Sequence, residues 1–559
     1  MRAQWNRLVQ LWESAQVELH GKYSTDRVLK LTQYARETSY LRAFAVILVT
    51  PLPCLVVTVL ADPSEGVAAN KMFFVRDHLI TFVLTFICIN QFRVSLPILP
   101  YPIWRAFYHA VWISGLCAGV LYGLSRSFGF PFPFSLMVVT PPWVTLISIS
   151  LAFEWVKKIR ETPGAQNVVI NVLKVWMCQV VLEFIYLPYY YIFTTLSDRA
   201  QTAFALFLPV IKLAMRNVFA RTVVHLSDEM PEVIVFNVEV FNALFVSCCM
   251  QNSPSFWTTL ELMLIDIGMI ILSVRDMEKI RIGLKDLEQR IDERKLGSDC
   301  NSIGNASVGN QASSTLERTK ILLEQGMKSR AKTSSLELVR VASHEEPATG
   351  LTRPRKKVGV MSLVTKVRNA HPTAKHTAIR VHPAAESSSK SITAVNVTGA
   401  AETAMKNVSV NVRYTRKVQR LLYLAEFLLL LNYVEIVIPL VFSMYMVATY
   451  ELPNREYYAQ LHGMTHRELM QTLENVMFYC SLQIGSLLLL VFILHKQLGL
   501  SPIHQLAFVL EKQWDGIQIR LVFWVFYNVQ ASLQHYGYDY TFGWTMRCLV
   551  EVDPCNQKS

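Results

Sequence analysis

Charged residues are scarce in this sequence. They make up 17% of its 559 residues, whereas hydrophobic residues make up 52%. Soluble globular domains carry about 25% charged residues, so this chain is too apolar for one soluble core. Repeated runs of about 20 apolar residues are typical of helices that cross a membrane. The sequence therefore predicts an all-α, polytopic helical membrane protein whose main partner is the lipid bilayer.

A removable signal peptide is also missing. The first forty residues lack a short apolar region followed by a small-residue cleavage site, so we expect the first span to act as its own signal anchor. The ten cysteines include no CxxC pair and lie mostly inside apolar runs. They are predicted to be buried free thiols, which excludes a disulfide framework and a zinc site.

Sequence motifs of soluble enzymes are absent as well. The chain has no GxxxxGK[ST] phosphate loop, no GxGxxG, no GxSxG and no HExxH. His462 and His466 in HGMTH lack the glutamate that a zinc protease needs. We therefore expect no enzymatic activity, no cofactor and no nucleic-acid partner.

About ten segments are apolar enough to cross the membrane. They are Leu41–Leu60, Ile80–Val94, Trp104–Leu124, Phe134–Phe153, Val168–Leu196, Thr202–Ala220, Val233–Met250, Phe256–Val274, Leu421–Val447 and Val476–Leu494. Loops on one side of these spans hold most of the flanking Lys and Arg residues, as the positive-inside rule requires. This pattern predicts that both termini and the linker lie in the cytoplasm. The membrane is expected to be a eukaryotic endomembrane or the plasma membrane.

Composition divides the chain into six parts. We expect a cytoplasmic amphipathic region (1–40), a bundle of about eight spans (41–274), a cytoplasmic amphipathic helix (275–296), a disordered basic linker (297–412), a two-span unit (413–494) and a C-terminal amphipathic or interfacial region (495–559). Between residues 296 and 412, 16 Lys and Arg stand against 8 Asp and Glu, a net charge of +8. Its RPRKK cluster, Arg353–Lys357, suits contact with anionic lipid, although a merely soluble tail explains it equally well.

Two segments outside the spans have helical patterns. Apolar residues from Met277 to Ile291 recur three and four apart, which predicts a stripe that docks on the protein itself or forms a homo-oligomer. Near the C-terminus, Ser501 and Pro502 begin a predicted helix and Gly516 ends it. The apolar segment that follows is expected to be buried against the bundle or to lie in the membrane interface.

Gly115, Gly119 and Gly123 share one face of the third span. Small residues at this spacing let two membrane helices approach closely. They predict a helix-packing site, for which a sliding contact is the functional alternative.

Ionisable residues at membrane depth form the candidate site. Lys212 and Arg216 lie four apart on the sixth predicted span, and Glu239, Glu261 and Asp266 lie on the next two. Each unpaired charge would cost about 2.5 to 3.5 kcal/mol on the insertion scale, so we expect them to face inward and pair. A structural ion-pair core and a polar pathway both explain this cluster.

Two functions follow from these alternatives. The first is transport of an ion or small polar solute through a polar path in the first bundle. The second is a non-transporting scaffold or receptor-like protein with structural ion pairs and a linker that binds partners or lipid. The sequons at Asn305, Asn396 and Asn407 all lie in the linker, on the cytoplasmic side, where they would not be glycosylated. If Leu206–Arg221 lay in the interface instead of spanning, the linker would be lumenal.

Several blocks of the sequence resemble a known group. They are TPLPCL (Thr50–Leu55), LPVIKLAMRNVFARTVVHL (Leu208–Leu226), MQNSPS (Met250–Ser255), SPIHQLAFVLE and LVFWVFYNVQASLQH. The chain resembles a family of large multi-pass transmembrane proteins of oomycetes that has no assigned activity. This resemblance implies an integral membrane protein and transfers no binding or catalytic residue.

Overall fold

The computed structural model describes residues 21–60, 72–130, 132, 134–205, 207–226, 228–252, 256–299, 315–325, 395–452, 455, 458, 461–498, 501–531 and 536. The regular elements in these ranges are helices and none is a strand, which confirms the all-α class. They are α2 (Thr25–Glu37), α3 (Tyr40–Val49), α4 (Leu52–Leu60), α5 (Met72–Ser95), α6 (Ile103–Phe128), α7 (Ser135–Glu161), α8 (Ala165–Thr195), α9 (Asp198–Ala205), α10 (Phe207–Thr222), η3 (Val224–Leu226), α11 (Met230–Ile234), the π-helical turn η4 (Val235–Glu239), α12 (Val240–Asn252), α13 (Phe256–Asp299), α15 (Val395–Tyr450), α16 (His466–Leu498), α17 (Pro502–Lys512) and α18 (Trp514–Ala531).

Eight stretches of the described residues are long and apolar enough to cross a membrane. They are Tyr40–Val59, Met72–Ser95, Ile103–Phe128, Ser135–Glu161, Ala165–Tyr186, Met230–Ser247, Val410–Tyr450 and His466–Lys496. The chain is thus an integral membrane protein with several spans. The sixth expected span is divided between α9 and α10, and the eighth lies in α13, so a total of about ten stays a prediction.

Prolines act differently along the chain. Pro51 separates α3 from α4, whereas α7 continues through Pro141 and Pro142 and α15 continues through Pro439. Pro209 lies in the first turn of α10, where a backbone N–H has no intrahelical partner to lose. Pro209 therefore fits the beginning of this helix and does not interrupt it.

The most buried helices lie at the centre of one compact unit. In Met230–Ser247, all residues of the most apolar part are buried. The buried share is 89% in the most apolar part of Val410–Tyr450 and 22% in that of Ser135–Glu161. The described residues up to Lys320 and from Arg413 belong to this one unit. The structure thus joins the two membrane blocks that we expected to form separate units, and α15 becomes a core helix.

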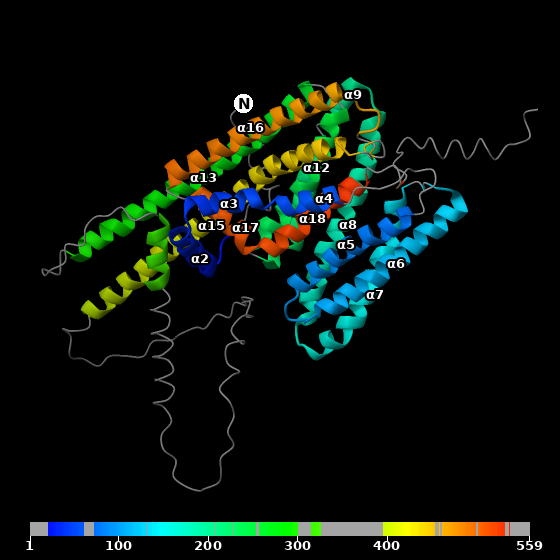
Figure 1. Ribbon diagram of the computed structural model, residues 1–559. Helices are drawn as coiled ribbons and strands as arrows, with labels where there is room; N and C mark the ends of the chain where they lie inside the picture. Colours follow the sequence, from blue (N-terminus) through cyan, green and yellow to red (C-terminus); the bar gives the residue numbers. More distant parts are fainter. Residues whose placement is uncertain are drawn as a thin grey trace, which may run out of the picture. The chain divides into compact units, whose positions relative to one another are not determined.

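The C-terminal helices α17 and α18 are also part of the core. In Figure 1 they lie beside α3 and α4 from the start of the chain. Ile517, Leu521 and Trp524 are at most 1% exposed. Of the two expected positions for this segment, the structure therefore has α18 buried against the bundle and not in the membrane interface. Gly516 does not end a helix as predicted, because it lies in the first turn of α18.

α18 runs from one end of the bundle to the other. Near its start, Arg520 pairs with Glu232 of α11. Near its end, Gln530 accepts a hydrogen bond of 2.9 Å from Arg76 in the first turns of α5. Beyond it, Tyr536 donates to Asp77 of the same helix at 2.9 Å. The 18 residues of α18 cover about 27 Å, close to the thickness of the bilayer core.

The predicted amphipathic helix is part of α13, and the predicted linker is partly helical. The stripe residues Met277, Leu284, Leu287 and Ile291 are buried on α13, which continues directly from the eighth predicted span. Residues 315–325 and 395–412 are helical, so the expectation of a linker without structure is wrong there. The rest of the linker, with Arg353–Lys357, and the first 20 residues lie outside the described part.

We expect the residues after α18 to emerge on the opposite face from the α16–α17 connection. One epitope inserted between residues 499 and 500 and another added after Ser559 should show opposite accessibility in sealed, oriented vesicles, because α18 passes between them. The measurement is antibody binding before and after the membrane is permeabilised. Equal accessibility of the two epitopes would contradict a crossing α18.

Candidate functional site

Four charged side chains from three helical segments meet inside the bundle. Lys212 Nζ on α10 lies 2.9 Å from Glu239 Oε2 and 2.9 Å from Glu435 Oε1 on α15. One helical turn further along α10, Arg216 donates from Nε to Glu239 Oε1. We call these four residues the tetrad.

The tetrad is almost fully removed from solvent. Glu239 is 0% exposed, Glu435 2%, Arg216 3% and Lys212 9%. Two positive and two negative charges make the group formally neutral, which lowers the cost of placing it at membrane depth. The Arg216 guanidinium also lies 6.0 Å from the centre of the Phe427 ring, a cation–π contact.

Local sequence explains how the tetrad is positioned. Residues four apart on a helix share a face, so Lys212 and Arg216 point to the same neighbour. Glu239 is the last residue of the π-helical turn η4, which interrupts the α-helical path of the seventh span. Turns of this kind widen the helix and are frequent at functional sites. Here η4 presents both Asn237 and Glu239 to the interior.

A chain of neutral polar side chains leads toward the tetrad. Gln91 of α5 donates to Gln179 of α8 at 3.0 Å, and Gln179 donates to Asn237 at 2.6 Å. Trp524 of α18 donates to the same Asn237 oxygen at 3.1 Å. Asn237 is two residues from Glu239 in η4, so this chain leads from the end of α5 to the turn that carries Glu239.

Two polar groups close to the tetrad have no hydrogen-bond partner among the described residues. They are the hydroxyl of Tyr186 on α8 and the side-chain oxygen of Asn242 on α12. Tyr186 is 1% exposed and lies between the rings of Phe241 and Phe245, at 4.8 and 5.4 Å between centroids. A buried polar group without a partner costs about 1 to 3 kcal/mol, which favours a water molecule or a solute at this place.

The structure brings together three of the five sequence-predicted charges, namely Lys212, Arg216 and Glu239. The side chains of Glu261 and Asp266 on α13 lie outside the described part. The fourth tetrad member, Glu435, is not among the predicted site residues, and its span was expected to belong to a separate two-span unit. The amides of Gln179 and Asn237 carry too weak a sequence signal to be identified.

The three predicted packing glycines lie on an exposed face of α6. A Cβ atom at Gly119 or Gly123 would meet nothing within 4 Å, and one at Gly115 would come within 3.7 Å of the His78 ring of α5. Their role in helix packing stays a prediction.

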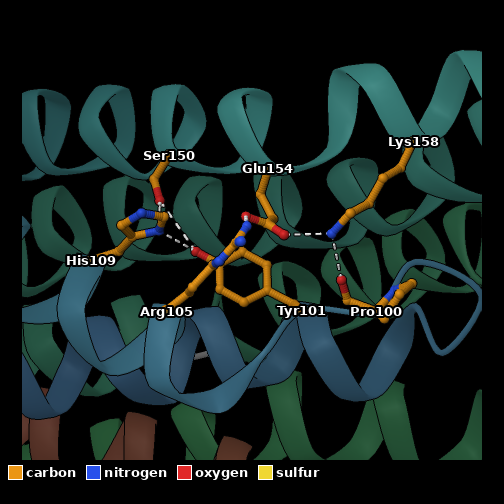
Figure 2. Close-up of polar contacts among 7 residues, drawn as sticks. All are labelled: Pro100, Tyr101, Arg105, His109, Ser150, Glu154 and Lys158. Atoms are coloured by element: carbon orange, nitrogen blue, oxygen red, sulfur yellow. Dashed lines mark hydrogen bonds and ion pairs between the residues drawn. The ribbon is translucent and has the colours of Figure 1, made fainter.

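A second polar cluster connects the start of α6 with the end of α7 (Figure 2). Ser150 and the Tyr101 hydroxyl both contact Nδ1 of His109, the former at 2.8 Å. Glu154 pairs with Arg105 at 2.9 Å and with Lys158. Burial raises the pKa of Tyr101, so its hydroxyl stays protonated. With no cavity described beside it, this cluster joins two helix ends.

Comparison with protein-family models, curated proteins and solved structures finds no match. The resemblance to oomycete membrane proteins therefore stays a prediction.

Removing one carboxylate from the tetrad should destabilise the protein. In Glu239→Gln, Lys212 and Arg216 lose the acid that they share, with an expected cost of about 3 to 5 kcal/mol. The measurement is thermal unfolding of the purified protein in detergent. The double variant Arg216→Met/Glu239→Gln restores neutrality and should lose less.

The matched control is Asp286→Asn, which removes an exposed partner of Arg290 and should change stability by less than about 0.5 kcal/mol. An equal loss in the single and double tetrad variants would show that the charges are not coupled.

Proposed function

We propose that this multi-pass membrane protein transports an ion or a small polar solute, and that the tetrad lies on its path. The observation that carries the proposal is the hydrogen-bonded chain of Gln91, Gln179 and Asn237, which leads from one end of the bundle to the π-helical turn that also carries Glu239. A purely structural ion-pair core needs no such connection.

The sharing of Lys212 supports the same proposal. Lys212 bridges two carboxylates, whereas Glu239 is also held by Arg216. A cation or proton that takes the place of Lys212 at Glu435 leaves Glu239 paired. The tetrad can therefore change partners at Glu435 without leaving a buried charge at Glu239 uncompensated, which is the large cost of breaking a buried ion pair. The unpartnered groups of Tyr186 and Asn242 offer further contacts for a passing solute.

The positive-inside rule orients the path. The basic residues Lys157, Lys158 and Arg160 at the end of α7 favour a cytoplasmic position for that end of the bundle, and for the ends of α5 and α13. The described N-terminal residues then lie on the cytoplasmic side. A crossing α18 would place Tyr536 on the other side, and the epitope measurement distinguishes this from the expectation that both termini are cytoplasmic.

Flux through the purified protein tests the proposal. We expect proteoliposomes to show protein-dependent uptake of at least one member of a panel of protons, alkali cations and radiolabelled amino acids, amines and sugars. In Arg216→Met/Glu239→Gln, which stays neutral, this uptake should fall by at least about tenfold because Lys212 then has no second carboxylate to pair with when it leaves Glu435.

The control removes an ion pair away from the path. Arg105 of α6 lies 2.9 Å from Glu154 of α7, and Arg105→Met/Glu154→Gln removes this pair with the same change in chemistry. Its uptake should stay within about twofold of the unmodified protein. Uptake that persists in the tetrad variant would overturn the path, and no uptake of any panel member would favour the scaffold function.

A further inference from the structure

A pocket opens where α5, α11 and the α17–α18 junction meet. It has a volume of about 330 Å³. This volume is within the range of small-molecule sites. Polar and charged side chains line it, among them Gln91, Glu229, Glu232, Gln513, Asp515 and Arg520. Because Gln91 also begins the polar chain toward the tetrad, the pocket is the entrance of the proposed path.

A buried ion pair forms the wall of this pocket. Glu232 and Arg520 are 3% and 7% exposed, and Arg520 Nη1 donates to Glu232 Oε1. The absence of a side chain at Gly516 permits the contact, since a Cβ atom there would come within 2.7 Å of Glu232 Oε1 and 3.0 Å of Arg520 Nη1. The pair is therefore built into the start of α18 and held in place.

Part of this wall is left without partners. Arg520 Nε is buried and makes no hydrogen bond to another described residue, and the same holds for both polar atoms of the Gln513 side chain. Arg520 is a charged donor whose second edge needs an acceptor, because burying it unpaired is costly. A carboxylate on a bound molecule would provide that acceptor.

The opposite charge is available at the rim. Glu229 and Asp515 are exposed and form no ion pair with another described residue. Glu511 is already held by Arg42 at 2.7 Å and by the Tyr34 hydroxyl at 2.7 Å. Burial and this bond to Glu511 raise the pKa of Tyr34 to about 12, so the hydroxyl remains a donor at neutral pH. Two carboxylates are thus left for a positive group.

We propose that this pocket binds a zwitterionic amino acid, with its carboxylate at Arg520 Nε and Gln513 and its ammonium group at Glu229 and Asp515. This amino acid is a transported substrate only if the proposed transport function holds. Its binding to the pocket is independent of flux. The half-buried Trp514 ring beside these groups covers the apolar part of the molecule.

Binding to the purified full-length protein in nanodiscs tests the assignment. The probes are radiolabelled L-alanine, L-leucine and L-serine, with ethylamine, acetate and glucose as competitors. We expect saturable binding of at least one amino acid, and at least tenfold weaker competition by the three molecules that lack one or both charges. Equal competition by ethylamine would overturn the role of Arg520, and absence of amino-acid binding would overturn the proposal.

Two variants with a matched control locate the site. Arg520→Lys keeps the charge opposite Glu232 but removes Nε, and Glu229→Gln/Asp515→Asn removes the rim carboxylates. Each should weaken amino-acid binding at least about tenfold, with the unfolding temperature unchanged for the exposed pair. Glu278→Gln/Asp286→Asn removes two acids from α13 and should bind as the unmodified protein does. Unaltered binding in both pocket variants would overturn the site.

The binding experiment and the flux assay can fail independently of each other. Binding without uptake would leave the pocket in place and remove the transport function. Uptake of another panel member without amino-acid binding would remove the pocket assignment and keep the path.

Discussion

Charges inside a bilayer must be paired, and this requirement determines how the central helices of the protein are arranged. Lys212 and Arg216 cannot lie on α10 without acids from other helices, and Glu239 and Glu435 come from segments almost 200 residues apart in the chain. The pairing therefore draws α15 against α10 and η4 and makes one unit of two sequence blocks. Arg27–Glu426 and Glu232–Arg520 are further buried pairs that connect the ends of the chain to the same centre.

The position of α18 follows from the same physics. This helix carries Gln518, Arg520, Asn528 and Gln530 and is not among the eight stretches that are long and apolar enough to cross a membrane. It can cross the depth of the bundle because α4, α5 and α12 surround it and its polar groups bond to them and to its own backbone. Shielding from lipid thus replaces apolarity as the condition for crossing a membrane.

The difference between lipid exposure and burial explains what could be predicted from the sequence. The long apolar runs of α5 to α8, α15 and α16 can be recognised from hydropathy, whether they face lipid or, like α15, are buried. The cost of a lone charge also identifies Lys212, Arg216 and Glu239 as a group. Hydropathy identifies the segment of α18 as apolar but does not decide between burial and an interfacial position, and no local pattern connects residue 212 with residue 435. Pairing across such a separation is a property of the packed structure.

The unequal sharing of charge within the tetrad is what distinguishes it from the other buried pairs. In Arg27–Glu426 and Glu232–Arg520 a broken contact leaves two buried charges to be resolved. In the tetrad, Arg216 holds Glu239 when Lys212 turns away from Glu435, so one contact can open at lower cost. The shared lysine also joins α15 to α10 and η4, which a rigid bundle would use as well. A path through which a solute's positive group replaces Lys212 at Glu435 depends on it, and the zwitterion pocket at the end of the polar chain is where such a group would enter.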